Sequence, residues 1–270
     1  MNIIPIDDPD DPRVGSYRDI RERDLAGREG RFIAEGKVVL DVLFTARRFD
    51  VESVLLLENR MAGMADTLAK AQPDVPVYLA SASVIDRIAG FHLHRGVLAV
   101  GRRRPPEALD AMLAALPARA TVLVLVGIAN HDNAGAIFRN AAAFGVDAVF
   151  LDATSCDPLY RKAIRVSVGA ALKVPFHAGA SADEILAALG DAGFVPVALS
   201  PKAATDIRTL GWPERTALVL GTEGEGLPPA LLDRLATARI AMAGGLDSLN
   251  VATAAAIALH EAFARGATKQ

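Results

Sequence analysis

Five polar residues in the second half of the chain are of types, and at positions, that could take part in catalysis or ligand binding. Each lies in a segment that follows an apolar stretch typical of a buried strand. Because the carboxyl ends of parallel strands form the ligand-binding edge of a sheet, we expect these segments to meet there. The five candidates are Asn133, Arg139, Glu223, Ser248 and Asn250.

Arg139 is a fixed cation within a helix predicted from about Ala134 to Phe144, which is otherwise small and apolar. A lone helical arginine usually extends to solvent, so composition alone supports a site only weakly. Asn133 is well placed to cap the helix, and capping alone would explain it. Since the two are six residues apart and would not share one helix face, Asn133 is expected in the preceding loop or cap.

The segment Leu218–Pro229 combines three glycines with two acids. The glycines free the backbone for positive φ and for close approach to a ligand. Glu223 and Glu225 make the loop acidic, which would repel a phosphate but suit a ligand with a positive centre. A tight turn with incidental glutamates is the alternative.

The segment Ile240–Phe263 joins a predicted flexible loop at Gly244–Gly245 to the last helix, expected from about Asn250 to Arg265. Ser248 or Asn250 can cap that helix. A capped packing helix would explain either residue alone. It does not explain why three such loops arrive at the same sheet edge.

Apolar strands and helical patterns alternate around these segments, which predicts a parallel sheet with helices on both faces. The expected strands are 121–127, 147–151, 194–199, 217–221 and 238–242, and the expected helices are 107–115, 134–144, 181–190, a short one after Pro228, and 250–265.

Earlier in the chain, strands predicted at 51–57, 75–80 and 96–101 indicate a separate small α/β unit. The basic, proline-containing stretch Gly101–Pro106 predicts a linker. We therefore expect three parts, which are a flexible, acidic tail at 1–12, an α/β domain at 13–104 and a second domain at 105–270.

Composition excludes several classes of protein. The 270 residues are 51% hydrophobic and 23% charged, which rules out a disordered or collagen-like chain. Cys156, the single cysteine, cannot form an internal disulfide and argues against structural zinc, so no metal is expected and a reducing cytoplasm fits best. No segment approaches the roughly 18 apolar residues of a membrane span. The net charge of −3 means that any nucleic-acid site must be a local basic patch.

Common nucleotide and nucleophile signatures are missing. The spacing from Gly30 to Gly36-Lys37 is one residue too long for a P-loop, and Val38 stands where Ser or Thr is needed. The glycines of the acidic loop run in the wrong order for a dinucleotide fingerprint. No G-x-S-x-G nucleophile elbow occurs. His92 and His94 have no third ligand nearby, so two exposed histidines account for them better than a metal site.

The three polar segments, in their order and spacing, resemble the motifs of the SpoU (TrmH) family of RNA ribose 2′-O-methyltransferases, in the SPOUT superfamily. The resemblance runs from about Val122 to Phe263 and is carried by LGTEGEGLP and SLNVATAAAIALHEAF. IAEGKVVLDVL and HRGVLAV in the first half resemble the family's RNA-binding α/β domain. The resemblance implies a parallel sheet tied in a trefoil knot, a homodimer packed around the first-motif and last helices, and S-adenosylmethionine as cofactor.

Carried to matching positions, the resemblance assigns the cofactor mainly to backbone groups of loop residues. An acidic loop then suits the sulfonium cation of the cofactor. The implied binding residues are Gly221, Ile240 and Leu249, with Leu220, Thr222 and Met242 as neighbours.

The implied reaction is in-line attack of a ribose 2′-oxygen on the activated methyl. Arg139 has been proposed in the family as base or base assistant. Because a guanidinium keeps its proton and has no acceptor, we expect instead that it grips the target phosphate and stabilises the developing alkoxide. Ser248 and Asn250 are expected to orient Arg139 or the ribose.

The 2′-hydroxyl distinguishes RNA from DNA, and structured RNA is the implied substrate, with rRNA favoured over tRNA. A non-catalytic RNA-binding or assembly protein that keeps the knot is the first alternative, and a dehydrogenase on a doubly wound sheet is the second. Between Arg13 and Arg48, nine basic residues stand against six acidic ones, although a solvated helix face would also explain this stretch. The expected RNA contacts are Arg102, Arg103, Arg161, Lys162 and Arg165.

Overall fold

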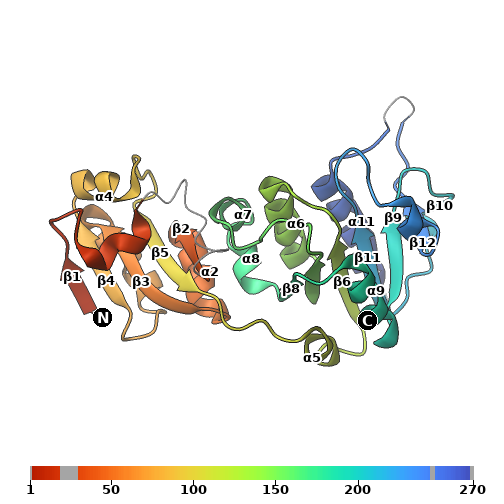
Figure 1. The fold of residues 1–270 in the computed structure, drawn as a ribbon, viewed down its shortest axis with the longest axis horizontal. Helices are drawn as coiled ribbons and strands as arrows, with labels where there is room; N and C mark the ends of the chain where they lie inside the picture. Colours follow the sequence, from red (N-terminus) through yellow and green to blue (C-terminus); the bar gives the residue numbers. More distant parts are fainter. Residues whose placement is uncertain (1, 19–29, 244–246, 268–270) are drawn as a thin grey trace. The chain divides into compact units, whose positions relative to one another are not determined.

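The chain folds into two compact units, each with its own sheet. A computed structural model describes residues 2–18, 30–243 and 247–267 (Figure 1). The first unit comprises Met1–Pro105 and Asp157–Lys173, and the second comprises Pro106–Cys156 and Val174–Gln270.

In the described part of the first unit, five strands form one mixed sheet in the order β1-β4-β3-β5-β2. β4 pairs in parallel with β1 and β3, whereas β5 runs antiparallel to β3 and β2. The strands are β1 Asn2–Pro5, β2 Arg31–Glu35, β3 Asp50–Leu57, β4 Pro76–Ala80 and β5 Val97–Arg102. The α-helices are α2 Lys37–Ala46, α3 Met61–Leu68, α4 Ala82–Ala89, α7 Arg161–Val166 and α8 Ala170–Lys173.

The N-terminal segment departs from the expected flexible tail. Residues Asn2–Pro5 form an edge strand that pairs with β4, and Ile6 is buried in the core beside Val14 and Tyr17. The side chain of Asp11 accepts a hydrogen bond from the Arg13 amide and caps a 3-10 helix that begins with Pro12. The expectation was wrong here because the acids and prolines of the segment form a turn and a cap, while Ile4 and Ile6 pack against the core.

The segment Asp157–Lys173 was expected within the second domain but packs in the first unit. Arg161 of α7 forms an ion pair with Glu35 of β2 at 2.7 Å, and both side chains are largely buried. Gly169, with φ +86°, brings α8 against α2, since a Cβ there would lie 3.1 Å from the Cβ of Val42. Nothing in the local pattern of this segment indicates a partner so distant in sequence.

In the described part of the second unit, seven strands form a sheet in the order β10-β12-β9-β11-β6-β7-β8, and every pair is parallel. The predicted parallel α/β sheet is confirmed. The strands are β6 Ala120–Leu125, β7 Ala148–Leu151, β8 Phe176–Ala178, β9 Val195–Leu199, β10 Thr205–Asp206, β11 Arg215–Leu220 and β12 Ala236–Arg239. The α-helices are α5 Leu109–Ala114, α6 His131–Ala143, α9 Ala182–Asp191, α10 Pro229–Leu232 and α11 Val251–Ala267.

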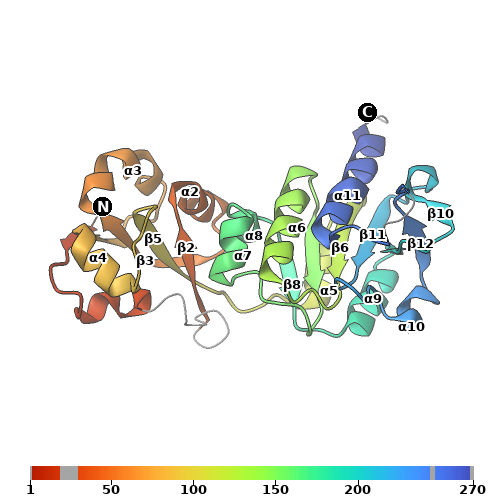
Figure 2. The same cartoon turned by 90° about the horizontal axis from the view of Figure 1, so that it is seen from above.

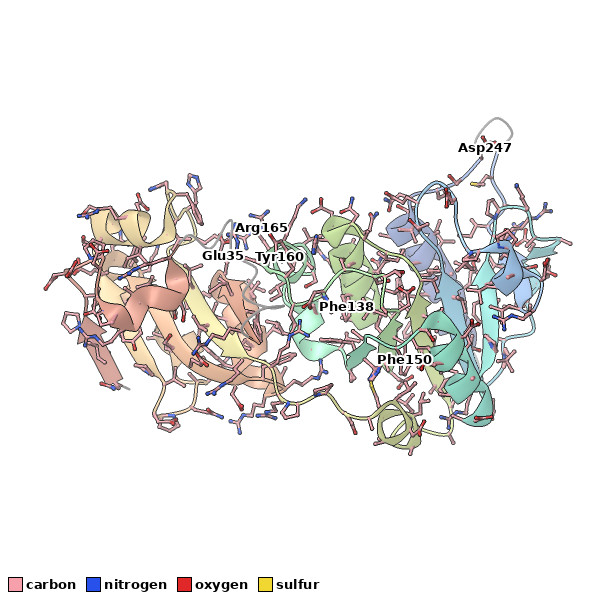
Figure 3. The ribbon with its side chains drawn as sticks, in the orientation of Figure 1. Glu35, Phe138, Phe150, Tyr160, Arg165 and Asp247 are labelled. Atoms are coloured by element: carbon pink, nitrogen blue, oxygen red, sulfur yellow. The ribbon has the colours of Figure 1, made fainter. Side chains whose placement is uncertain are left out.

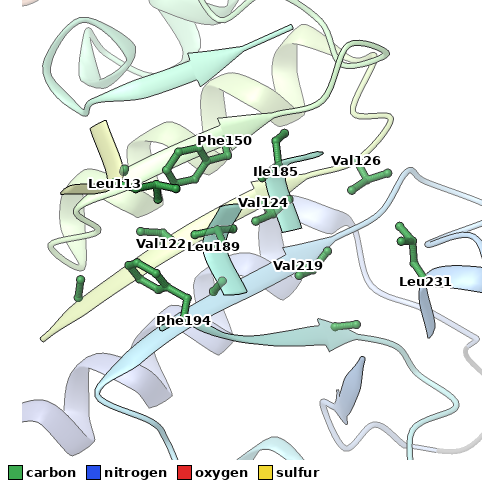
Figure 4. Packing of buried hydrophobic residues seen from close by; sticks show 14 of the residues in the cluster. Leu113, Val122, Val124, Val126, Phe150, Ile185, Leu189, Phe194, Val219 and Leu231 are labelled. Atoms are coloured by element: carbon green, nitrogen blue, oxygen red, sulfur yellow. The ribbon is translucent and has the colours of Figure 1, made fainter. Parts of the chain in front are cut away.

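Helices cover both faces of this sheet, with α6 and α11 on one side and α5 and α9 on the other (Figure 2). Residues 122–125 of β6 are fully buried, as expected for a strand covered on both faces. Their alternate side chains Val122 and Val124 pack with Ile185 and Leu189 of α9 (Figure 4). This core holds the strands in register and so fixes the loops that leave their carboxyl ends.

Candidate active site

A cavity of about 980 Å³ lies in the second unit at the carboxyl ends of three adjacent strands, β12, β9 and β11. This is the edge of a parallel sheet where ligands bind. Three loops line it, one following each strand. Their lining residues include Ser200–Lys202 after β9, Gly221–Leu227 after β11, and Ile240, Met242 and Asp247–Asn250 after β12. Leu199 and Leu220, the last residues of β9 and β11, also line the cavity.

All six residues expected to bind a cofactor line this cavity. Strand β12 ends at Arg239, earlier than predicted, so two of them lie in the loop after β12 and not within the strand. The predicted Gly244–Gly245 loop lies outside the described residues. The six are Leu220, Gly221, Thr222, Ile240, Met242 and Leu249.

The loop after β11 is closed on itself. Thr222 and Gly226 form an isolated antiparallel bridge, and the Gly226 amide donates to the Thr222 carbonyl at 3.1 Å. Gly221 must be glycine, because a Cβ there would overlap the backbone nitrogen of Leu227 and lie 2.5 Å from the carbonyl carbon of Gly226. Gly224 and Gly226 both have positive φ. The predicted need for backbone freedom is thus met by a tight turn along the cavity wall.

Asn250 joins the three polar segments. Its Oδ1 accepts hydrogen bonds from the amides of Ala252 and Thr253, so it caps α11. Its Nδ2 donates to Asn133 Oδ1 at 3.0 Å and to Glu223 Oε1 at 2.6 Å. The backbone donors fix the amide orientation, and both protons of Nδ2 are used.

Asn133 lies inside α6, which corrects the expectation of a loop or cap position. The helix begins at His131, and Asn130 is its cap, with Oδ1 accepting from the Asp132 amide at 2.8 Å. Asn133 is only 7% exposed and accepts the Asn250 hydrogen bond described above. Sequence reasoning chose the wrong asparagine because two of them, three residues apart, both precede the apolar part of the helix.

Arg139 is exposed on α6 and forms no hydrogen bond or ion pair with the residues that the structure describes. Neither Ser248 nor Asn250 hydrogen-bonds to it, and Oδ1 of Asn250, the atom that could accept from a guanidinium, already accepts from the amides of Ala252 and Thr253. The other expected role of Ser248 and Asn250, orienting the ribose, stays a prediction. The next residue, Asn140, donates to the Ala252 carbonyl at 2.8 Å and ties α6 to α11. Arg139 is therefore a free cation on a firmly held helix.

Asp152, at the end of β7, holds the loop that leads into α6. It is 7% exposed, and its carboxylate accepts from the Gly127 amide at 3.0 Å and from the Thr154 and Ser155 hydroxyls at 2.6 and 2.7 Å. A Cβ at Gly127 would lie 3.6 Å from that of Thr222, so this loop passes close to the loop after β11. Sequence reasoning missed Asp152, although its place after a buried strand was a signal.

Reasoning from motifs also missed the loop after β9. Ser200, Pro201 and Lys202 line the cavity, although this stretch matches no pattern. Its place at the end of the strand predicted at 194–199 was the available signal.

The five basic residues expected to bind RNA belong to the first unit, and at least three are paired there. Arg102 contacts Glu52 at 3.2 Å, Arg103 pairs with Asp157, and Arg161 pairs with Glu35. Arg165 has no partner among the described residues, and Lys162 is exposed. Figure 3 labels Glu35 on β2 and Arg165 on α7, and it labels Asp247 in the loop before α11.

Other kinds of site are not visible in the described ranges. No group of three His, Cys, Asp or Glu side chains there is arranged to hold a metal ion. None of the described helices is long and apolar enough to cross a membrane.

Comparisons of the sequence with known proteins all find RNA methyltransferases. The model of the SpoU rRNA Methylase family matches residues 120–260. An uncharacterized tRNA/rRNA methyltransferase of Mycobacterium bovis is 42% identical over 272 residues, covering 97% of this chain and 92% of the relative. The 23S rRNA (guanosine-2'-O-)-methyltransferase RlmB of Acinetobacter baylyi is 33% identical over 202 residues, covering 72% and 81%.

Solved structures agree over nearly the full chain. The AdoMet-bound rRNA methyltransferase from Sinorhizobium meliloti superposes with a TM-score of 0.82 at 25% identity, covering 97% of this chain and 98% of the other. A structure described as an RNA 2'-O ribose methyltransferase gives 0.79 at 26% identity, covering 98% and 99%.

Proposed function

The chain belongs to the SpoU rRNA methylase family, and from that premise we propose that it transfers a methyl group from S-adenosylmethionine to a ribose 2′-hydroxyl of structured RNA. The observation that carries the proposal is the meeting of Asn133, Glu223 and Asn250 through hydrogen bonds beside the cavity. The names of the relatives, which include a guanosine 2′-O-methyltransferase acting on 23S rRNA, support rRNA over tRNA.

The cavity suits the cofactor of this family in size, shape and charge. Its volume falls within the roughly 300–1,000 Å³ of small-molecule sites. The absence of a side chain at Gly221 lets the loop after β11 close and present backbone groups along the wall. Glu223, Glu225 and Asp247 supply negative charge that matches a sulfonium cation. Leu220, Ile240 and Leu249 offer apolar surface for an adenine ring.

Bound S-adenosylmethionine supplies an electrophilic methyl group, and the protein must align a ribose 2′-oxygen with it and ease loss of the hydroxyl proton. Arg139 grips the phosphate beside the target ribose and stabilises charge developing on the 2′-oxygen. Asn250 holds Glu223 and Asn133 in fixed positions through its two donated hydrogen bonds. Ser248 lies on the cavity wall, where its hydroxyl contacts substrate or cofactor.

The first unit is proposed as the RNA-binding domain, and residues 105–270, apart from the segment that packs in the first unit, as the methyltransferase domain. Arg165, which has no partner among the described residues, contacts a phosphate, and Arg102 and Lys162 are proposed as further phosphate contacts. Arg103 and Arg161 serve first to hold the unit together through their carboxylate partners.

The finer features of the family are proposed for the second unit as well. A trefoil knot is proposed because the fold of the SpoU family implies it. A homodimer through α6 and α11 is supported by exposed apolar side chains on α11, Ile257 at 36% and Phe263 at 53%. The cytoplasm is the proposed site of action.

Methyl transfer to total RNA tests the proposal. Purified protein incubated with RNA and methyl-labelled S-adenosylmethionine is expected to label RNA and to yield ribose-methylated nucleosides. A protein that binds RNA and cofactor but labels no cellular RNA would favour the alternative, a non-catalytic RNA-binding or assembly factor. Titration with NAD is expected to give no binding, which would rule out the second alternative, a dehydrogenase.

A further inference from the structure

The cavity is charged asymmetrically. Four charged residues line it within the described part of the chain, and three of them are acidic: Glu223, Glu225 and Asp247. The fourth, Lys202, comes from the loop after β9, whereas the acids come from the loops after β11 and β12. One positive charge therefore stands on a different loop from the negative charges.

The backbone around Lys202 is held by the sheet. The Ser200 amide donates to the Ala238 carbonyl of β12 at 3.0 Å, and the Ala203 amide donates to the Ser200 carbonyl at 3.2 Å. Ala203 is buried, at 7% exposed, which anchors the far side of the turn. Lys202 therefore extends from a fixed turn and not from a loose loop.

The side chain of Lys202 is free to bind. Its Nζ has no hydrogen-bond or ion-pair partner among the residues that the structure describes, and the residue is exposed. A lysine ammonium is a compact charge on a flexible stem, suited to meeting a carboxylate oxygen at the edge of a site. The acidic residues of the other loops do not neutralise it.

We propose that Lys202 binds the α-carboxylate of S-adenosylmethionine and so recognises the amino-acid end of the cofactor. This inference rests on the proposed function. The cofactor carries two positive groups, the sulfonium and the ammonium, and one negative group. Three acids and one lysine on the cavity wall match that pattern in sign, and among the described lining residues Lys202 carries the positive charge that can meet the negative group.

The test compares two ligands that differ only in the amino-acid group. S-Adenosylhomocysteine and 5′-methylthioadenosine are both neutral thioethers at sulfur, but only the first has the carboxylate and ammonium. Isothermal titration of the full-length protein is expected to show that Lys202→Gln weakens S-adenosylhomocysteine binding by about tenfold, the scale of one charge-assisted hydrogen bond. Binding of 5′-methylthioadenosine should stay within twofold, and Lys202→Arg should restore most of the loss.

Lys173→Gln, which removes a lysine outside the cavity lining, is the matched control and should change neither affinity. Equal weakening of both ligands by Lys202→Gln would show that the lysine supports the cavity wall, which overturns the inference, as would no weakening of either. If the wild-type protein binds neither thioether nor S-adenosylmethionine, the proposed function itself fails. Binding of S-adenosylmethionine that is indifferent to Lys202 contradicts only this inference.

Discussion

Arg139 is exposed and has no hydrogen-bond or ion-pair partner among the described residues, and it lies on a helix that is tied to its neighbour. Arg139→Ala is expected to lower methyl transfer at least a hundredfold, the scale of losing one charge-stabilising donor. The dissociation constant for S-adenosylmethionine should change less than twofold, because Arg139 does not line the cavity. Transfer assays and titration calorimetry measure the two effects.

Arg139→Lys is the control, since it keeps the charge but loses the planar fork that suits a phosphate. It should recover part of the activity. Simultaneous loss of cofactor binding and activity in Arg139→Ala would point to a role in folding and would contradict the assignment.

Asn250 has two roles that substitutions can separate. Asn250→Ala removes the cap of α11 and should lower the free energy of unfolding by about 1 kcal/mol. Asn250→Asp keeps a capping oxygen but replaces the donor to Glu223 and Asn133 with an acceptor. Both variants should lose methyl transfer, while urea titration should find the Asp variant the more stable. An active Asp variant would show that the donated hydrogen bonds do not matter.

Arg161 and Arg165 lie on the same short helix, but their substitutions should have different effects, one on stability and the other on RNA binding. Arg161→Ala leaves Glu35, whose side chain is 8% exposed, without its ion-pair partner. Its expected cost is about 3 kcal/mol in the free energy of unfolding, measured by urea. Arg165→Ala should change stability by less than about 0.5 kcal/mol but weaken RNA binding and reduce its salt dependence by about one phosphate contact. The reverse pattern would exchange their assigned roles.

Among the elements, the loop after β11 depends most strictly on one residue. Gly221→Ala is expected to weaken S-adenosylmethionine binding at least tenfold, because the added Cβ would collide with the backbone of Gly226 and Leu227, which cannot rotate away. Gly211→Ala is the matched control, since nothing lies within 4 Å of its Cβ position. Unchanged affinity in Gly221→Ala, by calorimetry, would mean that the loop rearranges freely and does not shape the cavity.

The elements also show what the sequence can and cannot predict. Strands β3, β4, β6, β7, β9 and β11 lie close to their predicted ranges because each is a continuous apolar run. β1 and β10 were missed because they are short edge strands with polar or proline neighbours, which carry little hydrophobic signal. The start of α6 was misplaced because Asn130 and Asn133 are equally good caps by residue type. Only the hydrogen bond from Asn250 to Asn133 in the folded chain distinguishes them.

For the molecule as a whole, we predict a homodimer through α6 and α11. Phe144 packs against Phe263 with ring centroids 6.2 Å apart, and Phe263 remains half exposed. Phe263→Ser together with Ile257→Ser should shift the mass measured by light scattering from dimer to monomer. A wild-type monomer at micromolar concentration would contradict the prediction. Lys70→Ser, in the first unit, is the control and should leave the mass unchanged.

At this scale, sequence reasoning expected the three polar segments to meet because the carboxyl ends of parallel strands share one edge, and the resemblance to the SpoU family supplied the cofactor residues. It did not foresee that Asp157–Lys173 packs in the first unit, because a buried ion pair between residues 126 positions apart leaves no local pattern. Net charge likewise gave no sign that Arg103 and Arg161 are already paired. Patterns along the chain report strands and helices, whereas pairing of charges depends on the finished fold.

The most direct test of the central claim is the chemical identity of the methylated product. RNA treated with the wild-type protein and S-adenosylmethionine is digested to nucleosides and analysed by mass spectrometry, with Arg139→Ala as the parallel sample. We predict a nucleoside carrying one methyl group on its ribose, formed by the wild type and absent with Arg139→Ala. A methyl group on a base, or no methylated nucleoside with any cellular RNA, would contradict the account.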